Sequence, residues 1–252
     1  MGEYYKMFNK VISNPPYSKN LHLKILREVI KQNPEAEIVS LQPTRWLQDP
    51  LAEYKRGSDW KKFEDIRERI ESLDIIDGEE ATKLFGAAFY SLLGIYHIDS
   101  KEHEAFKYEF NPLIYKIINF PCKHFTYDKP KDKPYKMILP ATHGHLGKYD
   151  WAEITSKNWN VAKSVQASSE TNDYVVMTFD TEAEMKNFYD SLFLKLYMWL
   201  VKNIKTTAST AQYIKFVPVL PTYSHKWTDF MLYKYFGLTA EEIDTIEKEM
   251  KK

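Results

Sequence analysis

The fold is decided by the stretch Phe8-Asn9-Lys10-Val11-Ile12-Ser13-Asn14-Pro15-Pro16-Tyr17. Its apolar run predicts a strand over Phe8–Ser13, and the two prolines fix their own φ angles just behind it. A proline also disfavours the α region for the residue before it, so Asn14 is held extended at the end of the strand. The stretch therefore predicts a strand that ends in a stiff polar loop.

A helix and a second strand follow this loop. Leucine, isoleucine and valine recur at helical spacing from about Asn20 to Lys31, and Asn33-Pro34 stops the pattern. Residues Glu37–Leu41 then read as a strand that ends at Pro43-Thr44-Arg45-Trp46-Leu47. We expect a βαβ unit whose two strands are parallel.

The alternation of strands and helices continues to about residue 100. A helical pattern over Asp59–Ile70 leads to a strand over Ser72–Ile76. The apolar and aromatic stretch Ala87–Ile98 predicts either a strand pair or one long buried strand. Residues 1 to 105 are therefore interpreted as an α/β layer with a partial Rossmann-like sheet.

Beyond Lys101 the chain is rich in aromatic residues, lysine and proline, so residues 106 to 252 are interpreted as a second, α+β region. Short strands are predicted at Leu113–Ile118 and Tyr174–Phe179. The longest helix is predicted over Thr181–Lys202, and Thr239 with Glu242 predicts a capping box before a final helix. An apolar stripe marks the long helix: Met185, Phe188, Leu192, Leu196 and Trp199.

Composition limits the class of protein. The 252 residues are 44% hydrophobic and 28% charged, which excludes wholesale disorder, and no apolar stretch approaches a membrane span. Residues Met1–Lys10 lack the apolar core of a signal peptide, and Cys122 is the lone cysteine. We therefore expect a cytoplasmic protein without a disulfide and without a membrane partner.

A local basic segment offers a polyanion site, although 35 Lys and Arg balance 35 Asp and Glu over the chain. Lys123, Lys129 and Lys131 are interleaved with aromatic residues between Lys116 and Lys136. Such a mixture suits phosphate contact and base stacking. A solvated Lys-Pro loop is the alternative interpretation. His143 and His145 could be imagined as metal ligands, but two histidines on a loop are more often solvated, and no metal site is predicted.

The loop from Asn14 to Tyr17 indicates a chemistry. The side-chain oxygen of Asn14 and the carbonyl of Pro15 can both accept hydrogen bonds from one exocyclic amine. The ring of Tyr17 can stack on the base that carries this amine, whose lone pair then faces an incoming methyl group. A Pro-Pro loop with a packing aromatic is the alternative reading.

Together these segments resemble the adenine amino-methyltransferases of DNA restriction-modification systems, in which a target-recognition region follows the catalytic part. The resemblance runs along nearly the whole chain. It rests on the catalytic strand and loop and on five later segments: Ile38–Leu47, Phe179–Glu184, Lys215–Pro218, Trp227–Asp229 and Tyr235–Ile243.

The resemblance implies a fold, a reaction and site residues. The fold would be a partial methyltransferase sheet followed by a target-recognition-like region. A flipped adenine would donate to Asn14 and Pro15, stack on Tyr17 and lie in a loop held by Pro16, and DNA would be the partner. Arg45 and Trp46 would lie near the pocket mouth and contact substrate, although core packing explains Trp46 equally well.

One departure concerns the methyl donor, S-adenosylmethionine. Family members bind it in a glycine-rich turn ahead of the catalytic motif, whereas this sequence has thirteen residues before Asn14 and no Gly-x-Gly pair. The cofactor-binding residues are therefore unknown. The missing half would also leave Phe8–Ile12 as an exposed sheet edge, so we expect a second polypeptide or a second copy of the chain to cover it.

Two other functions stay open. The chain could be a catalytically inactive DNA- or protein-binding module, a regulator or decoy of a restriction system, because the donor half is missing. The same motif also serves methyltransferases that act on RNA bases or glutamine amides. The recognition-like C-terminal region favours DNA.

Overall fold

The computed structural model describes residues 8–86, 91–123, 135–140, 173–206 and 211–251. They divide into two compact units, Met1–Glu109 and Phe110–Lys252. The change of composition after Lys101 lies just before this division.

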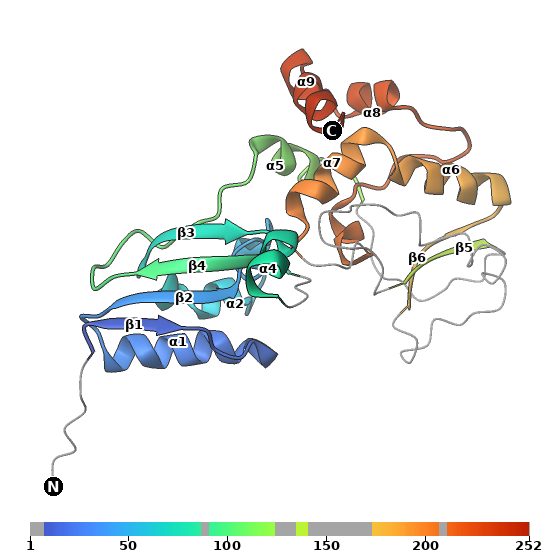
Figure 1. Cartoon of the computed structure of the whole chain (residues 1–252). Helices are drawn as coiled ribbons and strands as arrows, with labels where there is room; N and C mark the ends of the chain where they lie inside the picture. Colours follow the sequence, from blue (N-terminus) through green and yellow to red (C-terminus); the bar gives the residue numbers. More distant parts are fainter. Residues whose placement is uncertain (1–7, 87–90, 124–134, 141–172, 207–210, 252) are drawn as a thin grey trace, which may run out of the picture. The chain divides into compact units, whose positions relative to one another are not determined.

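The first unit is an α/β layer around a four-stranded mixed sheet with the strand order β1-β2-β4-β3 (Figure 1). Its strands are β1 (Lys10–Ser13), β2 (Glu37–Pro43), β3 (Ile70–Ile76) and β4 (Leu93–Ile98). Its helices are α1 (Leu21–Gln32), α2 (Asp59–Lys62), α3 (Glu64–Arg67) and α4 (Gly78–Phe85), and short 3-10 turns lie at Ser18–Asn20 and Ala52–Tyr54.

The predicted βαβ unit is confirmed. Strands β1 and β2 pair in parallel, with Val11 opposite Ile38 and Ser13 opposite Ser40, and α1 connects them. Strand β4 is antiparallel to both β2 and β3, so β1, β2 and β3 run in the same direction. Their carboxyl ends therefore lie at one edge of the sheet.

The two faces of the sheet are covered unequally. On one face, helix α1 and the α2–α3 segment bury a core that includes Leu23, Leu26, Ile38, Ile66 and Tyr96. On the other face, α4 contributes a smaller cluster of Ala81 with Ile76 and Leu93. The main core of this unit is therefore on the α1 side.

The two ends of α1 differ in how they are fixed. At its start, Lys19 and Asn20 have φ angles of 50° and 60°, a left-handed turn that Asn tolerates better than most residues. At its end, the side-chain oxygen of Asn33 accepts a hydrogen bond from the backbone of Phe8 (2.9 Å), and its amide donates to Val29 O (3.1 Å). Asn33 thus ties the end of α1 to the segment that enters β1.

The prediction of one continuous helix over Asp59–Ile70 is wrong in two respects. The segment is split into α2 and α3 at Phe63, whose φ and ψ are −116° and 36°, and Ile70 already belongs to β3. The break lets the buried Phe63 ring pack edge-on against Trp46. Of the stretch Ala87–Ile98, residues 87–90 lie outside the described part, and β4 is one strand.

The second unit contains helices and one strand pair. Its helices are α5 (Pro112–Ile118), α6 (Glu182–Leu192), α7 (Lys195–Ile204), α8 (Asp229–Tyr235) and α9 (Ala240–Glu249), with a 3-10 segment at Ala211–Phe216. Strands β5 (Tyr135–Pro140) and β6 (Asp173–Phe179) pair antiparallel, and β6 confirms the strand predicted there.

The strand predicted at Leu113–Ile118 is wrong, because these residues form α5. Asn111 caps the helix by accepting a hydrogen bond from the Leu113 backbone (2.9 Å), and Pro112 occupies the first turn. Proline there is favourable because its missing N–H would have no helical partner anyway. The Asn-Pro start signal outweighs the strand preference of the isoleucines that follow.

The single long helix predicted over Thr181–Lys202 is also wrong, because α6 ends at Leu192 and α7 begins at Lys195. The carboxylate of Asp229 accepts a hydrogen bond from the Lys195 backbone (2.7 Å) and so holds the new helix start. All five residues of the predicted apolar stripe are nevertheless buried. The capping box of Thr239 and Glu242 is confirmed at the start of α9.

Within the described residues, no helix combines the length and the hydropathy that a membrane crossing needs.

We predict that Gly94→Ala destabilises the first unit. A Cβ atom at this position of β4 would lie 2.6 Å from both Leu73 Cδ1 and Thr44 Cγ2, so neighbouring atoms must shift. Overpacking of this kind costs about 1–3 kcal/mol. Urea unfolding measures the loss of unfolding free energy, and Ser72→Ala, at an exposed side chain of β3, is the control. Equal unfolding free energies of the two variants would contradict the predicted destabilisation.

Candidate functional site

The loop Asn14-Pro15-Pro16-Tyr17 leaves the carboxyl end of β1, and the segment from Thr44 to Trp46 leaves the carboxyl end of β2. Carboxyl ends of neighbouring parallel strands are the usual place for ligands in α/β sheets. Asn14 and Pro16 are exposed, Tyr17 is half-buried and Pro15 is buried. The loop thus presents an amide to solvent on a backbone anchored by one proline.

Tyr17 links this loop to β2. Its hydroxyl donates to Asn14 Oδ1 at 2.6 Å and approaches Leu41 O at 3.2 Å. Burial raises the pKa of Tyr17, so the hydroxyl keeps its proton near neutral pH. The Asn14 amide oxygen is therefore held toward the tyrosine, and it already serves as a hydrogen-bond acceptor.

A pocket of about 440 Å³ lies beside Tyr17 in the first unit. Its volume falls within the range of small-molecule sites, roughly 300–1,000 Å³. The lining residues are Tyr17, Asn20, His22, Pro43, Arg45, Trp46, Asp49, Ala52, Lys55, Ser58, Asp59 and Trp60. Three aromatic rings and both signs of charge therefore surround one cavity.

One part of the pocket lining is held by contacts with the core. Trp46 is 8% exposed, stacks against Tyr96 and donates from Nε1 to the Tyr96 hydroxyl (2.9 Å). The Tyr96 hydroxyl in turn donates to Pro43 O (3.1 Å). Trp46 is thus both a core residue and a pocket residue, so core packing and pocket lining coexist at this position.

The outer wall is fixed by polar contacts. Asn20 donates to Asp59 Oδ2 (2.8 Å), and Lys55 forms an ion pair with Asp49. Ser58 Oγ donates to Ala52 O (2.9 Å). These contacts hold carboxylates and a lysine at the rim, where they give the pocket hydrogen-bonding groups of both kinds.

His22 is a buried titratable residue at this site. It is 5% exposed, its ring meets Tyr17 edge-on, and its Nδ1 has no hydrogen-bond partner in the described structure. Burial lowers the pKa of His22, although a backbone hydrogen bond with Tyr17 and the charge of Asp59 act in the opposite direction. His22 is therefore a neutral imidazole behind the loop at neutral pH.

The structure brings some of the predicted site residues together. Tyr17, Arg45 and Trp46 line the same pocket, and Asn14 is joined to it through the Tyr17 hydroxyl. Lys123 belongs to the second unit, where it is exposed and its carbonyl accepts from the Val219 backbone (2.7 Å). Lys129 and Lys131, as well as His143 and His145, lie outside the described residues.

Sequence patterns missed most of the pocket. His22 was hidden in the apolar pattern of α1, and Asn20 marked only the start of that helix. No element was predicted from Asp49 to Ser58, and Asp59 and Trp60 were assigned only to the start of a helix. Trp60 and two aspartates within a short polar stretch were nevertheless a usable signal. No three residues among the described His, Cys, Asp and Glu are grouped so that they could hold a metal ion.

A scan against protein-family models and searches of curated proteins and of solved structures found no match to this chain.

The buried His22 predicts a pH dependence of stability. Its pKa is lowered in the folded chain and returns to about 6.5 on unfolding, so the unfolded chain binds more protons between these two values. The contribution of neutral His22 is fully present above about pH 6.5 and is lost as pH falls through the folded pKa.

Urea unfolding of the full chain between pH 5 and 8 measures this effect. We expect His22→Gln to flatten the loss of stability below pH 6.5, because glutamine does not bind a proton in this range. A His22→Gln profile that falls as steeply as that of the unaltered chain would contradict the assignment.

Proposed function

We propose that this chain is a subunit or fragment of a DNA adenine-N6 methyltransferase. It would accept a flipped adenine at the loop Asn14–Tyr17, while a partner chain supplies the site for S-adenosylmethionine. The observation that carries the proposal is the hydrogen bond to Asn14 Oδ1 from Tyr17, a residue that lines the pocket. It shows an amide acceptor and an aromatic ring placed together at the carboxyl edge of the sheet.

The chemistry required of this loop is orientation. An exocyclic adenine amine can take the place of the Tyr17 hydroxyl as donor to Asn14 Oδ1, and its second N–H can donate to the Pro15 carbonyl. With both hydrogens directed at acceptors, the lone pair of the nitrogen is left to face the methyl donor. Proximity and orientation alone are worth several orders of magnitude in rate.

The pocket supports a purine as the occupant. Tyr17, Trp46 and Trp60 line it, and stacking on an aromatic ring binds a base at about 1–3 kcal/mol. Extrusion of a base from a duplex costs a few kcal/mol, so contacts of this size are needed to hold it. Arg45 is exposed at the same pocket and can meet the phosphate of the flipped nucleotide.

The described loops do not fit the methyl donor. S-adenosylmethionine is bound by glycine-rich turns in the family that the sequence resembles, and the loop after β1 is built from prolines instead. The longer loop after β2 contains one glycine, Gly57, and no Gly-x-Gly pair. We therefore assign no residue of these described loops to the donor, and we infer that a partner brings it.

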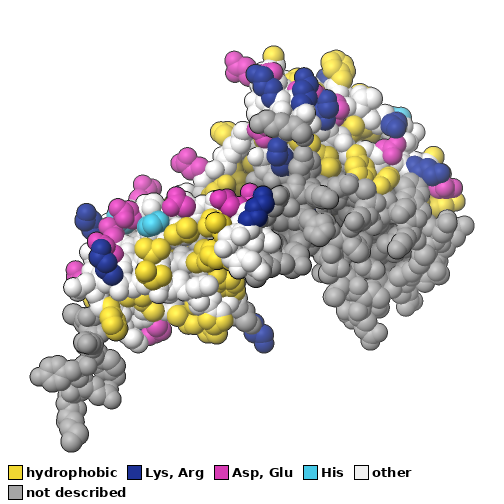
Figure 2. Space-filling view, viewed as in Figure 1, with side chains coloured by type: hydrophobic (Ala, Val, Ile, Leu, Met, Phe, Trp, Pro, Cys, Tyr) yellow, Lys and Arg dark blue, Asp and Glu magenta, His cyan; other side chains and the backbone are white. Residues whose placement is uncertain are grey.

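The open edge of β1 supports a partner. Among the described strands β1 pairs with β2 alone, and its Ile12 side chain is 89% exposed. Phe8, just before the strand, is 58% exposed. Ile12 also borders the less covered face of the sheet, where Val39, Leu41 and Ile95 are partly buried. Figure 2 shows hydrophobic side chains gathered over the sheet, with acidic side chains along one border.

A strand donated by a second polypeptide would satisfy the backbone groups of this edge. We favour a different chain over a second copy, because only a different chain would also bring the donor site.

The open edge equally favours the second candidate, a methyltransferase-like module that binds DNA or protein without catalysis. Such a module would keep its partner and its DNA when Asn14 is altered. A substitution of Asn14 therefore distinguishes the catalytic subunit from the inactive module.

The first test concerns the donor. We expect calorimetric titration of the isolated chain with S-adenosylmethionine to give no binding, because the donor site belongs to the partner. Tight binding by the chain alone would contradict the proposed division of the site.

The second test concerns catalysis. With the partner present, Asn14→Ala should lower methyl transfer from S-adenosylmethionine to DNA by on the order of 100-fold, because the amine loses one of its two orienting acceptors. Asn9→Ala, at an exposed side chain just before β1, is the matched control and should keep full activity. Unimpaired transfer by Asn14→Ala would sink the catalytic reading, and DNA binding without any transfer would favour the inactive module.

A further inference from the structure

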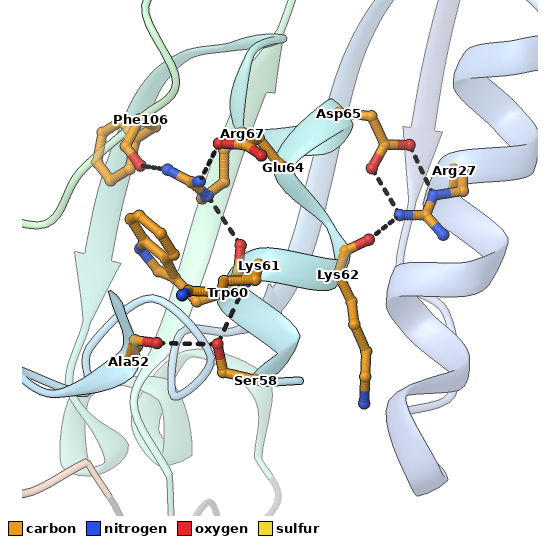
Figure 3. A network of polar contacts seen from close by, with 10 residues as sticks. All are labelled: Arg27, Ala52, Ser58, Trp60, Lys61, Lys62, Glu64, Asp65, Arg67 and Phe106. Atoms are coloured by element: carbon orange, nitrogen blue, oxygen red, sulfur yellow. Dashed lines mark hydrogen bonds and ion pairs between the residues drawn. The ribbon is translucent and has the colours of Figure 1, made fainter. Parts of the chain in front are cut away.

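The wall of the pocket that carries Trp60 is held from behind by Arg67 (Figure 3). Arg67 is 0% exposed, and its guanidinium carbon lies 3.5 Å from the centre of the Trp60 ring. Its Nε also donates to Trp60 O (3.0 Å). The indole that lines the pocket is therefore fixed both at its ring and at its backbone by one side chain.

The same guanidinium reaches the segment that leads to the second unit. This segment, residues 99–109, follows β4 and is named the connector here. Arg67 Nη1 donates to Phe106 O (3.0 Å), and the Phe106 backbone donates to Arg67 O (3.0 Å). The His103 backbone likewise donates to Glu68 O (2.7 Å). The connector is thus bonded to the same helix α3 that stands behind the pocket wall.

A buried charge makes these contacts interdependent. Glu64 is the carboxylate partner of Arg67 (3.2 Å), and the guanidinium has donors directed at Trp60, Phe106 and Glu64 together. Removing one acceptor from a guanidinium that is 0% exposed leaves a charged donor without that partner, which costs more than the loss of a neutral hydrogen bond. Opening of either the wall or the connector therefore removes an acceptor that Arg67 needs.

We propose that Arg67 is a positioning residue that makes the pocket wall, residues 52–68, and the connector open as one cooperative unit. A ligand bound against Trp60 then stabilises the chain segment that enters the second unit. The proposal rests on the proposed function in one respect, the choice of an adenine nucleotide as the ligand.

The coupling has a quantitative consequence. Regions of a protein that open together exchange their amide hydrogens with one opening free energy. A ligand that binds only the closed form slows this exchange by a factor of 1 + [L]/Kd in every amide of the unit. The wall and the connector should therefore be slowed by the same factor, while amides outside the unit are not.

The test is hydrogen–deuterium exchange of the full chain with and without 2′-deoxyadenosine 5′-monophosphate at ten times its measured Kd. We expect amides of residues 62–68 and those of His103 and Phe106 to slow by the same factor of about ten. Amides of α9 in the second unit are the reference and should not change. In the unaltered chain without ligand, the exchange rates of wall and connector amides should also depend on urea concentration in the same way. This measurement needs no variant.

Two variants assign the coupling to Arg67. Arg67→Lys keeps the charge but loses the planar fork and the stack on Trp60, whereas the backbone bonds of His103 and Phe106 to Glu68 O and Arg67 O remain. The connector should therefore slow by a smaller factor than the wall, no longer by the same factor. Arg69→Lys is the matched control: Arg69 donates to Asp99 O (2.7 Å) and Pro34 O (2.8 Å), so it holds the connector without touching Trp60. In this variant both segments should still slow together.

Each other outcome overturns a defined part of the proposal. A slowed wall with an unchanged connector in the unaltered chain refutes the coupling and leaves the adenine pocket standing. Equal slowing in Arg67→Lys, or lost coupling in Arg69→Lys, refutes the role given to Arg67. No slowing of either segment at any soluble nucleotide concentration refutes both the coupling and the adenine pocket.

Discussion

Parallel pairing of β1 with β2 is the constraint on which the first unit depends. Parallel neighbours cannot be joined by a tight turn, so the chain must cross over, and α1 is that crossover. The crossover brings both strands to the same edge with their carboxyl ends side by side. The side chains of Ser13 and Ser40 hydrogen bond to each other there (2.7 Å), one residue before the proline loop begins. The position of the pocket follows from this pairing, because its walls are the segments that leave β1 and β2.

Two aromatic residues of the pocket are held by residues that do not line it. Trp46 is anchored through Tyr96, and Trp60 is anchored through Arg67. A buried indole or guanidinium without partners would be costly, so these contacts fix the rings as well as satisfy them. The pocket lining therefore combines aromatic rings held at defined positions with charged residues of both signs. Recognition of a planar heterocycle requires apolar surface together with a few placed polar groups.

Local sequence signals predicted the parts of the fold that depend on neighbours along the chain. The run Phe8–Ser13, the periodicity of α1 and the capping box of Thr239 required only short-range information, and each has its expected element. The breaks at Phe63 and between α6 and α7 were missed, because each is caused by a tertiary contact. Phe63 leaves the helix to reach the core, and Asp229 comes from far along the sequence to cap α7. The loop Asn14–Tyr17 was visible as a motif for the same reason that His22 and Trp60 were not: its residues are contiguous, whereas the pocket is assembled by folding.

The two prolines behind β1 also set a limit on how the open edge can be used. Neither Pro15 nor Pro16 has an amide hydrogen, so a strand that adds to β1 finds no backbone donor in the two residues after Asn14. The edge available for pairing is thus a short segment with a defined end, not a free ribbon that can slide in register or recruit copy after copy. A short edge interrupted by proline is a poor template for extended sheet growth. The proline pair that stiffens the candidate site therefore also opposes fibrous assembly.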